Sequence, residues 1–368
     1  MDMNKLGFGF LRLPKIDEND DKSIDFPLLN KMVDSFLQKG GKYFDTAYTY
    51  LDGESEKALK TCLVKRHPRE SFFIADKLPT WKVKSHQECY KYFEEQLNRC
   101  GVTYFDNYML HWLNKEHYDI CKKYDEFEFL KELKQQGKAK KIGFSYHDNA
   151  ELLDKILSDH PEVDYVQLQI NYLDWKSPSI EAEKCYEVAK KHNKQIIVME
   201  PVKGGTLANL PEEADEIFKK IHPEKSTASW AIRFAQSLDQ VEIVLSGMSS
   251  LEQIYDNMKD MPILNDIELK VIEDVCQIIN NKTAIRCTGC SYCKNNCPQN
   301  ISIPEYFDLY NEYFRYPEED WKIKPIYDKI ASTNAKASDC IKCKSCEKNC
   351  PQKIEITSWL EKVSTVFE

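Results

Sequence analysis

The sequence predicts a parallel (β/α)8 barrel over residues 1–280 and a small, cysteine-rich α-helical domain over residues 281–368. Two observations support this division. Eight short apolar segments alternate with segments whose apolar residues recur at helical spacing. Eight of the 14 cysteines lie after residue 286, in two tight groups. Strands that are apolar throughout are typical of a parallel sheet buried on both faces, and eight strand–helix units fit a closed barrel.

Composition and charge narrow the class of protein. The 368 residues are 42% hydrophobic and 30% charged, as in a soluble globular protein. The net charge of −9 argues against a nucleic-acid-binding surface. No apolar run approaches the roughly 18–20 residues of a membrane span. Residues 1–14 do not resemble a signal peptide, so we expect a cytoplasmic protein whose cysteines serve a metal or catalysis rather than disulfides.

The elements of the barrel follow from local patterns. Strands are expected at residues 7–13, 42–44, 71–77, 105–111, 141–146, 163–171, 195–201 and 241–247. Helices are expected at residues 26–39, 54–65, 85–100, 127–136, 150–158, 180–192, 227–238, 251–259 and 267–280. In the segment 85–100, helical spacing places Cys89 and Cys100 beside Phe93 and Leu97, so these two cysteines are expected in the core.

An open, doubly wound sheet is the alternative architecture. Such a sheet usually carries a G-x-G-x-x-G turn after its first strand. Here Gly7-x-Gly9 is followed by Leu11-Arg12-Leu13, so that fingerprint is absent and the closed barrel is favoured.

Polar and ionisable residues gather at the carboxyl ends of the expected strands, where barrel enzymes carry their active sites. In chain order they are Asp45 with Tyr50, Lys77, His111, Ser145, Gln167 with Asn171, and Ser246-Gly247. Each residue alone would be an ordinary solvated or structural side chain. Together they predict proton transfer: Tyr50 as acid, Lys77 beside it lowering the tyrosine pKa, Asp45 holding the lysine, and His111 orienting a carbonyl.

The flanking residues carry a resemblance to the aldo/keto reductase family over residues 6–260. The matching patches are Asp45-Thr46-Ala47-x-x-Tyr50 with Gly53-x-Ser55-Glu56, Lys77 near the end of its strand, Asp106-x-Tyr108-Met109-Leu110-His111, and Ile142-Gly143-Phe144-Ser145. The resemblance implies a catalytic tetrad of Asp45, Tyr50, Lys77 and His111. It also implies reduction of an aldehyde or ketone by NAD(P)H, or the reverse oxidation.

The same resemblance implies the contacts to the nucleotide. Gln167, Ser145 and Asn171 would bind near the nicotinamide, and Met199 stands where the family often stacks a tyrosine. The phosphate-binding loop and helix start would be formed by Ser246, Gly247, Ser249, Gln253 and Asn257. The family's usual lysine and arginine for a 2′-phosphate appear here as Gly247 and Gln253, so NADP and NAD both remain candidates. A loop that merely caps a helix is the structural alternative for residues 246–257.

The C-terminal cysteines repeat one spacing twice. Cys287-x2-Cys290-x2-Cys293-x3-Cys297-Pro298 and Cys340-x2-Cys343-x2-Cys346-x3-Cys350-Pro351 both have the bacterial ferredoxin pattern, in which the fourth cysteine usually binds the other cluster. One [4Fe–4S] cluster is therefore predicted on Cys287, Cys290, Cys293 and Cys350. The other is predicted on Cys340, Cys343, Cys346 and Cys297. Zinc is the alternative for these cysteines, because paired C-x-x-C motifs also bind Zn²⁺.

The segment between the two cysteine groups indicates the type of domain. Expected helices at 303–314 and 321–330 separate the groups and resemble an α-helical ferredoxin, as in one branch of the aldo/keto reductases. Residues 281–286 are the expected junction between the two domains.

Two functions are compatible with these patterns. The first is an enzyme acting on a small carbonyl or alcohol substrate, whose clusters exchange electrons with ferredoxin or another carrier. A nicotinamide moves two electrons as hydride whereas each cluster moves one, and the sequence shows no flavin signature to couple them. The alternative is a nucleotide-binding regulatory or redox-sensing protein in which the clusters are structural or sensory. The intact set of four ionisable groups favours the enzyme.

Overall fold

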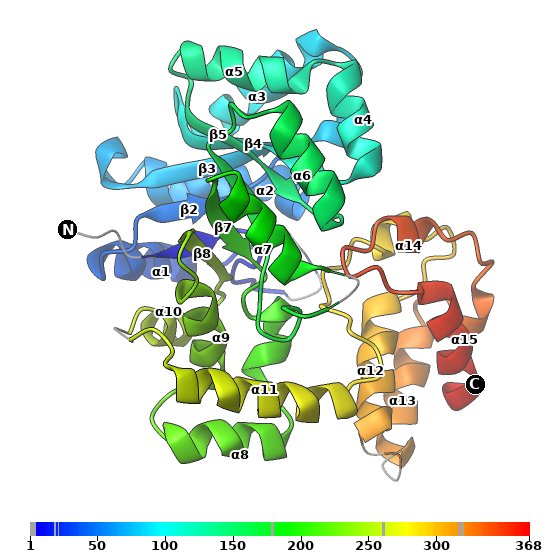
Figure 1. Cartoon of the computed structure of the whole chain (residues 1–368). Coiled ribbons are helices and arrows are strands. Elements are labelled where there is room, and N and C mark those ends of the chain that lie inside the picture. The colour runs from blue at the N-terminus through cyan, green and yellow to red at the C-terminus, as the bar shows by residue number, and fades with distance from the viewer. Residues whose placement is uncertain are drawn as a thin grey trace. The chain divides into compact units, whose positions relative to one another are not determined.

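The computed structural model describes residues 5–17, 20, 22–177, 180–259, 262–315, 317 and 320–368. Within them, eight parallel strands close into a barrel in the order β1 to β8 (Figure 1). The strands are β1 Leu6–Gly9, β2 Tyr43–Asp45, β3 Phe73–Leu78, β4 Phe105–Leu113, β5 Ala139–Tyr146, β6 Tyr165–Gln169, β7 Gln195–Met199 and β8 Val241–Gly247. The predicted barrel is confirmed, although its predicted start at residue 1 lies outside the described residues.

The barrel closes where β1 pairs with both β2 and β8. Gly7 lies opposite Tyr43 on one side and Leu245 on the other. The interior is filled by side chains, as in a packed core. The residues of this interior cluster are Tyr43, Ala75, Met109, Tyr165, Ile197, Ile243 and Leu245. At Gly143 a Cβ atom would lie 2.3 Å from the backbone oxygen of Tyr165, so only glycine fits there.

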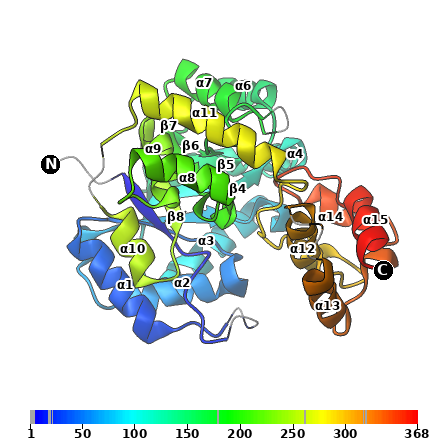
Figure 2. The same ribbon diagram turned by 90° about the horizontal axis from the view of Figure 1, so that it is seen from below.

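Helices cover the outside of the barrel (Figures 1 and 2). They are α1 Phe26–Gln38, α2 Glu54–Leu59, α3 His86–Cys100, α4 Lys115–Lys123, α5 Glu126–Gln135, α6 Ala150–Asp159, α7 Ala182–Lys191, α9 Thr227–Gln236 and α10 Leu251–Asn257. Cys89 and Cys100 of α3 are fully buried with Phe93, as their helical spacing predicts. Figure 2 shows α10 beside α1.

Some boundaries differ from the sequence prediction. The first strand ends at Gly9 rather than residue 13, and the helix expected over residues 54–65 ends at Leu59 and continues as the π-type turn Lys60–Val64. Strand β6 ends before Asn171, because the Asn171 side chain accepts a hydrogen bond from the Asp174 backbone nitrogen at 2.9 Å. That bond folds the chain into a turn. Helix α4 was not predicted.

Contacts group the chain into two compact units. The first consists of Met1–Pro201 with Ser229–Leu264, and the second of Val202–Ala228 with Asn265–Glu368. The second unit therefore includes α8 (Glu212–Ile221) and α11 (Asp266–Asn281), which precede the cysteine groups. The domain boundary between residues 280 and 281 stays a prediction.

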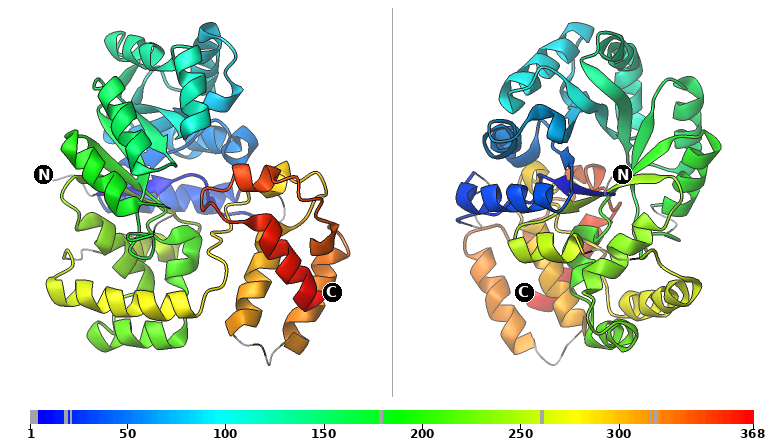
Figure 3. Two further views of the ribbon diagram at one scale, coloured as in Figure 1. Left: turned by 45° about the vertical axis from the view of Figure 1, so that its right-hand side comes forward. Right: turned by 90° about the vertical axis from the view of Figure 1, so that its left-hand side faces the viewer.

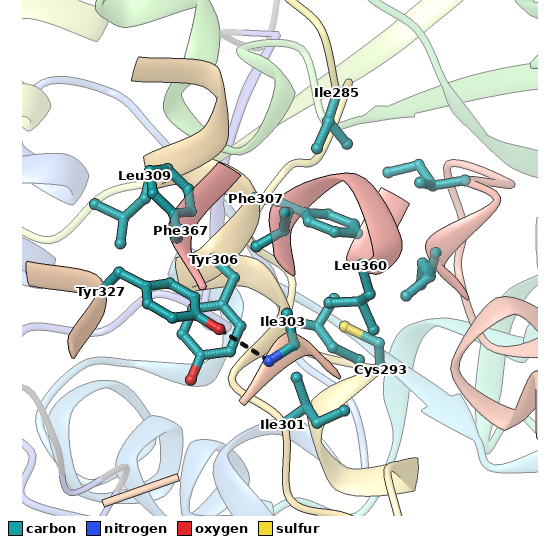
Figure 4. Close-up of a cluster of buried hydrophobic side chains, with 14 of the residues drawn as sticks. Ile285, Cys293, Ile301, Ile303, Tyr306, Phe307, Leu309, Tyr327, Leu360 and Phe367 are labelled. Atoms are coloured by element: carbon teal, nitrogen blue, oxygen red, sulfur yellow. Dashed lines mark hydrogen bonds between the residues drawn. The ribbon is translucent and has the colours of Figure 1, made fainter. Parts of the chain in front are cut away.

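The remaining helices of the second unit are α12 (Ile303–Arg315), α13 (Asp320–Ala331), α14 (Ser345–Lys348) and α15 (Ile356–Phe367). Figure 3 shows α12 and α13 as neighbouring helices with the red α15 beside them. Their facing sides form one core (Figure 4), in which the rings of Tyr306 and Tyr327 lie 4.6 Å apart and the backbone nitrogen of Ala337 donates to the Tyr327 hydroxyl at 3.0 Å. The helical C-terminal domain is confirmed.

None of the helices in the described residues combines the length and the apolar character that crossing a bilayer requires.

Candidate active site and cysteine sites

The four ionisable groups predicted for proton transfer lie together at one end of the barrel. Asp45 ends β2, Lys77 lies one residue before the end of β3, His111 lies in β4, and Tyr50 begins the short helical turn Tyr50–Gly53. Lys77 Nζ donates to Asp45 Oδ1 at 2.6 Å and to the Thr46 carbonyl oxygen at 2.7 Å. The exposed fractions of the Lys77 and Asp45 side chains are 0% and 4%, so this ion pair is buried.

Tyr50 lies against this pair. The Lys77 ammonium is 4.7 Å from the centroid of the Tyr50 ring. Burial, followed by the charges of Asp45, Asp76 and Glu200, raises the pKa of Tyr50 well above its ordinary value. The lowered pKa that the sequence predicted is wrong, because desolvation dominates and Asp45 balances the lysine charge. Tyr50 is therefore a protonated phenol at neutral pH.

His111 faces Tyr50 from the neighbouring strand, with their ring centroids 5.8 Å apart. Burial and then the Lys77 cation hold the pKa of His111 well below its ordinary value, so the imidazole is neutral at pH 7. Its Nδ1 is buried and finds no hydrogen-bond partner within the described part of the chain. A neutral imidazole carries one N–H donor, which suits a carbonyl oxygen.

Aromatic rings border His111. Trp81 lies 5.2 Å from the His111 ring and 5.7 Å from Trp112, and His117 stacks on Trp81 at 5.6 Å. These rings give the rim an apolar wall next to the ionisable groups. By contrast, Trp175 packs against Tyr186 and Phe234.

A buried polar network behind Lys77 escaped the sequence prediction. Asp76 accepts a hydrogen bond from the Lys77 backbone nitrogen at 2.8 Å, and Gln96 Nε2 donates to the Lys77 carbonyl at 3.0 Å. Arg99 pairs with buried Glu56 at 2.9 Å. Burial and the neighbouring Glu56 raise the pKa of Asp76 well above its ordinary value. Asp76 and Gln96 thus fix the backbone of Lys77. In the sequence, the feature that could have indicated this network was Glu56 in the motif Gly53-x-Ser55-Glu56.

Several residues predicted to bind the nicotinamide also lie together. Gln167 Nε2 lies 3.5 Å from the Met199 sulfur, and Ser145 accepts a hydrogen bond from the Trp112 backbone nitrogen at 2.7 Å. Asn171 Nδ2 donates to Asp174 at 2.9 Å and to the Glu200 carbonyl at 3.2 Å. The Gln167 Oε1 atom is buried and has no partner among the residues described. A buried acceptor without a partner suits the amide of a nicotinamide.

The loop after β8 is held by its own side chains. Asn257 Nδ2 donates to Ser246 Oγ at 3.1 Å, and the Ser249 backbone nitrogen donates to Gln253 Oε1 at 2.7 Å. Arg12, which follows β1, lies against Gly247: a Cβ atom there would be 3.3 Å from the arginine side chain. This exposed arginine, which sequence reasoning missed, lies beside the loop expected to bind phosphate.

The eight C-terminal cysteines line two pockets. Cys287, Cys290, Cys293 and Cys350 line one pocket. Cys297, Cys340, Cys343 and Cys346 line the other. The structure thus brings together the two sets that the ferredoxin spacing predicts, with the fourth cysteine of each run exchanged.

The chemistry of these pockets suits a bound metal centre. Burial raises the pKa of Cys287 to about 12 and that of Cys346 to about 11. Thiols in such apolar surroundings ionise when a cationic centre lies against them, and iron–sulfur clusters are held by thiolates. The residues present therefore fit the cluster that the spacing predicts.

The first pocket is covered by a segment from the loop after β7, which sequence reasoning missed. The turn Lys203–Ala208 belongs to the second unit, and Lys203 Nζ donates to Gln352 Oε1 at 2.9 Å inside the core. At Gly204 a Cβ atom would lie 2.2 Å from the Thr288 carbonyl oxygen. Thr288 and Gln352 both line the pocket of Cys287. The sequence offered no signal for this contact, because it joins residues 149 positions apart.

Comparison with known families identifies both parts of the chain. Residues 5–275 match the model of the aldo/keto reductase family. Residues 286–355 match the model of a 4Fe-4S dicluster domain.

Individual relatives agree with the aldo/keto reductase match. An aldo-keto reductase of Mycobacterium avium is 26% identical over 259 residues, which cover 70% of this chain and 80% of the relative. Glyoxal reductase of Bacillus subtilis is 28% identical over 188 residues, covering 45% of this chain and 64% of that enzyme.

Solved structures show the same fold. The holo form of an aldo-keto reductase from Bacillus halodurans is 22% identical with a TM-score of 0.59, covering 74% of this chain and 91% of that one. A Klebsiella pneumoniae aldo-keto reductase in complex with NADPH is 16% identical with a TM-score of 0.57. This match also covers 74% of this chain and 91% of that one.

Proposed function

This chain belongs to the aldo/keto reductase family, and from that premise we propose that it reduces a small aldehyde or ketone, or catalyses the reverse oxidation, with Tyr50 as the proton donor. The observation that carries the proposal is the buried Lys77–Asp45 pair with the Tyr50 ring 4.7 Å from the lysine ammonium. A buried ion pair is costly to build, and its place under a tyrosine at the barrel rim points to chemistry rather than stability.

Each group has a distinct task in this reaction. NAD(P)H, when bound, supplies hydride to the carbonyl carbon. The neutral His111 donates its N–H to the carbonyl oxygen, and Tyr50 gives that oxygen its phenolic proton. The Lys77 ammonium stabilises the phenolate that the proton leaves behind, and Asp45 keeps the ammonium in place. Trp81 and Trp112, whose rings lie beside His111 and beside each other, would limit water at the rim.

We also propose NADP as the preferred nucleotide. Arg12 beside Gly247 offers a cation for a 2′-phosphate at the position where the loop itself has no basic residue. Gln167, Ser145, Asn171 and Met199 would hold the nicotinamide end, while Ser246, Gly247, Ser249, Gln253 and Asn257 would form the phosphate end.

We further propose two [4Fe–4S] clusters, one in each cysteine pocket. Four cysteines line each pocket, and each set takes its fourth cysteine from the other run. That exchange is typical of the bacterial ferredoxin pattern and favours iron–sulfur clusters over zinc. The clusters would pass single electrons to or from an external carrier such as ferredoxin. Anaerobic protein should contain about eight iron and eight sulfide per chain, and zinc in their place would refute this assignment.

The carbonyl proposal is tested by Tyr50→Phe, with Tyr48→Phe as the control. Tyr48 is a neighbouring tyrosine whose hydroxyl donates to Glu95 at 3.1 Å, outside the four groups. Loss of a general acid should lower kcat for reduction of small aldehydes by roughly 10²–10⁴-fold. The affinity for NADPH, measured by its fluorescence, should stay unchanged. A Tyr50→Phe enzyme as fast as the Tyr48→Phe enzyme would reject the proposal.

A further inference from the structure

The two cysteine pockets differ in their exposure. Around the first, none of the four cysteines is exposed, and the turn that carries Lys203 packs on Thr288 and Gln352. In the second, Cys343 is exposed to solvent. Ile341, two residues before Cys343, has a large apolar side chain, and 59% of its surface is exposed. A redox centre in the second pocket would therefore come close to the protein surface.

The charge around the second pocket is opposite to that of the whole chain. The segment 336–353 contains five lysines and two acidic residues, so its net charge is +3, whereas the chain carries −9. All five lysines are exposed; they are Lys336, Lys342, Lys344, Lys348 and Lys353. A local cationic surface on an acidic protein attracts an acidic partner and orients it toward that surface.

Two of these lysines bracket the exposed cysteine. Lys342 and Lys344 flank Cys343 directly in the chain. Lys342 pairs with Glu361, and Lys344 Nζ lies 3.8 Å from Glu347. The side chains of both lysines are more than 60% exposed in these pairs. Exposed pairs of this kind are weak, so both ammonium groups can turn to a more strongly charged surface.

We propose that the surface formed by Ile341, Cys343 and these five lysines is the docking site of a small acidic iron–sulfur protein that carries one electron. The inference rests on the proposed function, since it requires a cluster in the second pocket. In the step, the carrier's [2Fe–2S]⁺ becomes [2Fe–2S]²⁺ and a [4Fe–4S]²⁺ of this chain becomes [4Fe–4S]⁺. One electron moves, no proton is transferred and no bond is broken. Ile341 supplies an apolar contact next to the exposed ligand, and the lysines set the orientation.

The test uses the full chain loaded with clusters and a plant-type acidic [2Fe–2S] ferredoxin. Stopped-flow mixing of reduced ferredoxin with oxidised protein measures the rate, and a redox-inactive, gallium-substituted ferredoxin measures the affinity without any turnover. The variant is Lys342→Glu, Lys344→Glu and Lys348→Glu combined. The control makes the same charge change at exposed lysines elsewhere: Lys65→Glu, Lys219→Glu and Lys220→Glu.

We expect the wild-type and control rates to fall steeply with added salt, and the docking variant to be slower by roughly 10–10³-fold at low salt with a flattened salt dependence. Gallium ferredoxin should bind the docking variant more weakly by a similar factor. Equal rates and affinities for the docking and control variants would overturn the proposal. Binding of a short DNA duplex as tight as binding of ferredoxin would overturn it too, by showing a general polyanion surface.

Two further readings separate this inference from the proposed function. Each variant should reach the same extent of cluster reduction with excess dithionite, which shows that its clusters are intact. Each should also keep wild-type aldehyde reduction by NADPH. If the wild type lacks reducible clusters or aldehyde reduction, the proposed function is wrong. If the variants differ only in the rate and affinity for ferredoxin, the difference supports the docking surface alone.

Discussion

The rim of the barrel and the cysteine pockets of the second unit solve the problem of buried polar groups in different ways. At the rim, Lys77 is held by Asp45 and the Thr46 carbonyl, so the protein itself balances the charge. In the second unit, Cys293 and Cys346 belong to the hydrophobic core, and Cys287, Cys297, Cys340 and Cys350 pack against it. The charged groups that act on the Cys293 thiol are other cysteines, with no cationic side chain among them.

The difference teaches where each region obtains its stability. The barrel has closed strand pairing and a large apolar interior, so its site is ordered by the fold. The second unit is small, and six cysteines occupy positions in or against its core. Small domains often depend on a metal centre to fold, because their cores bury too little apolar surface. We therefore expect the barrel to be independent of iron and the second unit to require it.

Removal of iron should have the largest effect. Anaerobic chelation should abolish the protection of the second unit against limited proteolysis, because a cluster bound in each pocket would link segments far apart in the chain. The barrel should keep its NADPH affinity. The variant Cys293→Ser should show the same loss, while Cys276→Ser, which changes a half-buried cysteine of α11 outside both pockets, should keep the iron. A second unit that stays protected without iron would contradict the comparison.

Substitution of Lys77 should have the next largest effect, and it probes the barrel. Lys77→Met leaves the Asp45 carboxylate buried without its cation, which should cost about 3–5 kcal/mol of unfolding free energy at pH 8. Burial already raises the pKa of Asp45, and without Lys77 the carboxyl would take up a proton on folding. Because the folded-state pKa of this carboxyl would lie above its unfolded value, the loss of unfolding free energy should grow with pH. From pH 8 down toward pH 5, the loss should therefore shrink by about 1.4 kcal/mol per pH unit.

The control for this prediction is Lys155→Met, which breaks the exposed pair with Asp159. Exposed pairs contribute about 0–1 kcal/mol, so urea unfolding of this variant should be close to wild type at every pH. An equal loss in the two variants would show that the rim pair is no more important to the fold than a surface pair.

Glu126→Gln should have the smallest effect, and its sign should be stabilising. Glu126 begins α5, is fully buried and accepts a hydrogen bond from the Cys121 thiol at 3.3 Å. Burial raises its pKa from 4.5 to about 7. The wild type therefore loses stability between pH 4.5 and 7, as the unfolded chain releases a proton that the folded chain keeps.

The variant escapes that loss. Its unfolding free energy should exceed that of the wild type by up to about 3 kcal/mol at pH 8 and match it near pH 4. Glu128→Gln, on the same helix and exposed, is the control and should change the free energy by less than about 0.5 kcal/mol at both pH values. A pH-independent difference between the Glu126 variant and wild type would show that this carboxyl does not titrate on folding.

Much of the fold was predictable because it follows from local patterns. Apolar strands and helical spacing located all eight strands and most helices, and the cysteine spacing located both pockets. Helix α15 was missed although Ile356, Leu360, Val363 and Phe367 have helical spacing. Helix α8 lies in a polar segment with few apolar residues, so its pattern was weaker.

The structure brings the four predicted groups together, and it changes the predicted direction of one pKa. Strand ends in a parallel barrel all reach the same rim, so Asp45, Lys77 and His111 had to meet there. Whether the pKa of Tyr50 is raised or lowered depends on which effect is larger, the burial of the ring or the charge of nearby groups. That comparison requires the depth of the ring and the partner of Lys77, and neither is written in the local sequence.

The sequence by itself determined the strand–helix alternation, the residues at the barrel rim and the two sets of cysteines, because periodicity and spacing are properties of neighbouring residues. Only the tertiary structure decided which groups meet across long separations: Lys203 with Gln352, Arg99 with Glu56, and Arg12 with Gly247. It also decided that one cysteine pocket is covered and the other has an exposed edge. Burial and contact between distant segments are set by how the whole chain packs, and no local pattern encodes them.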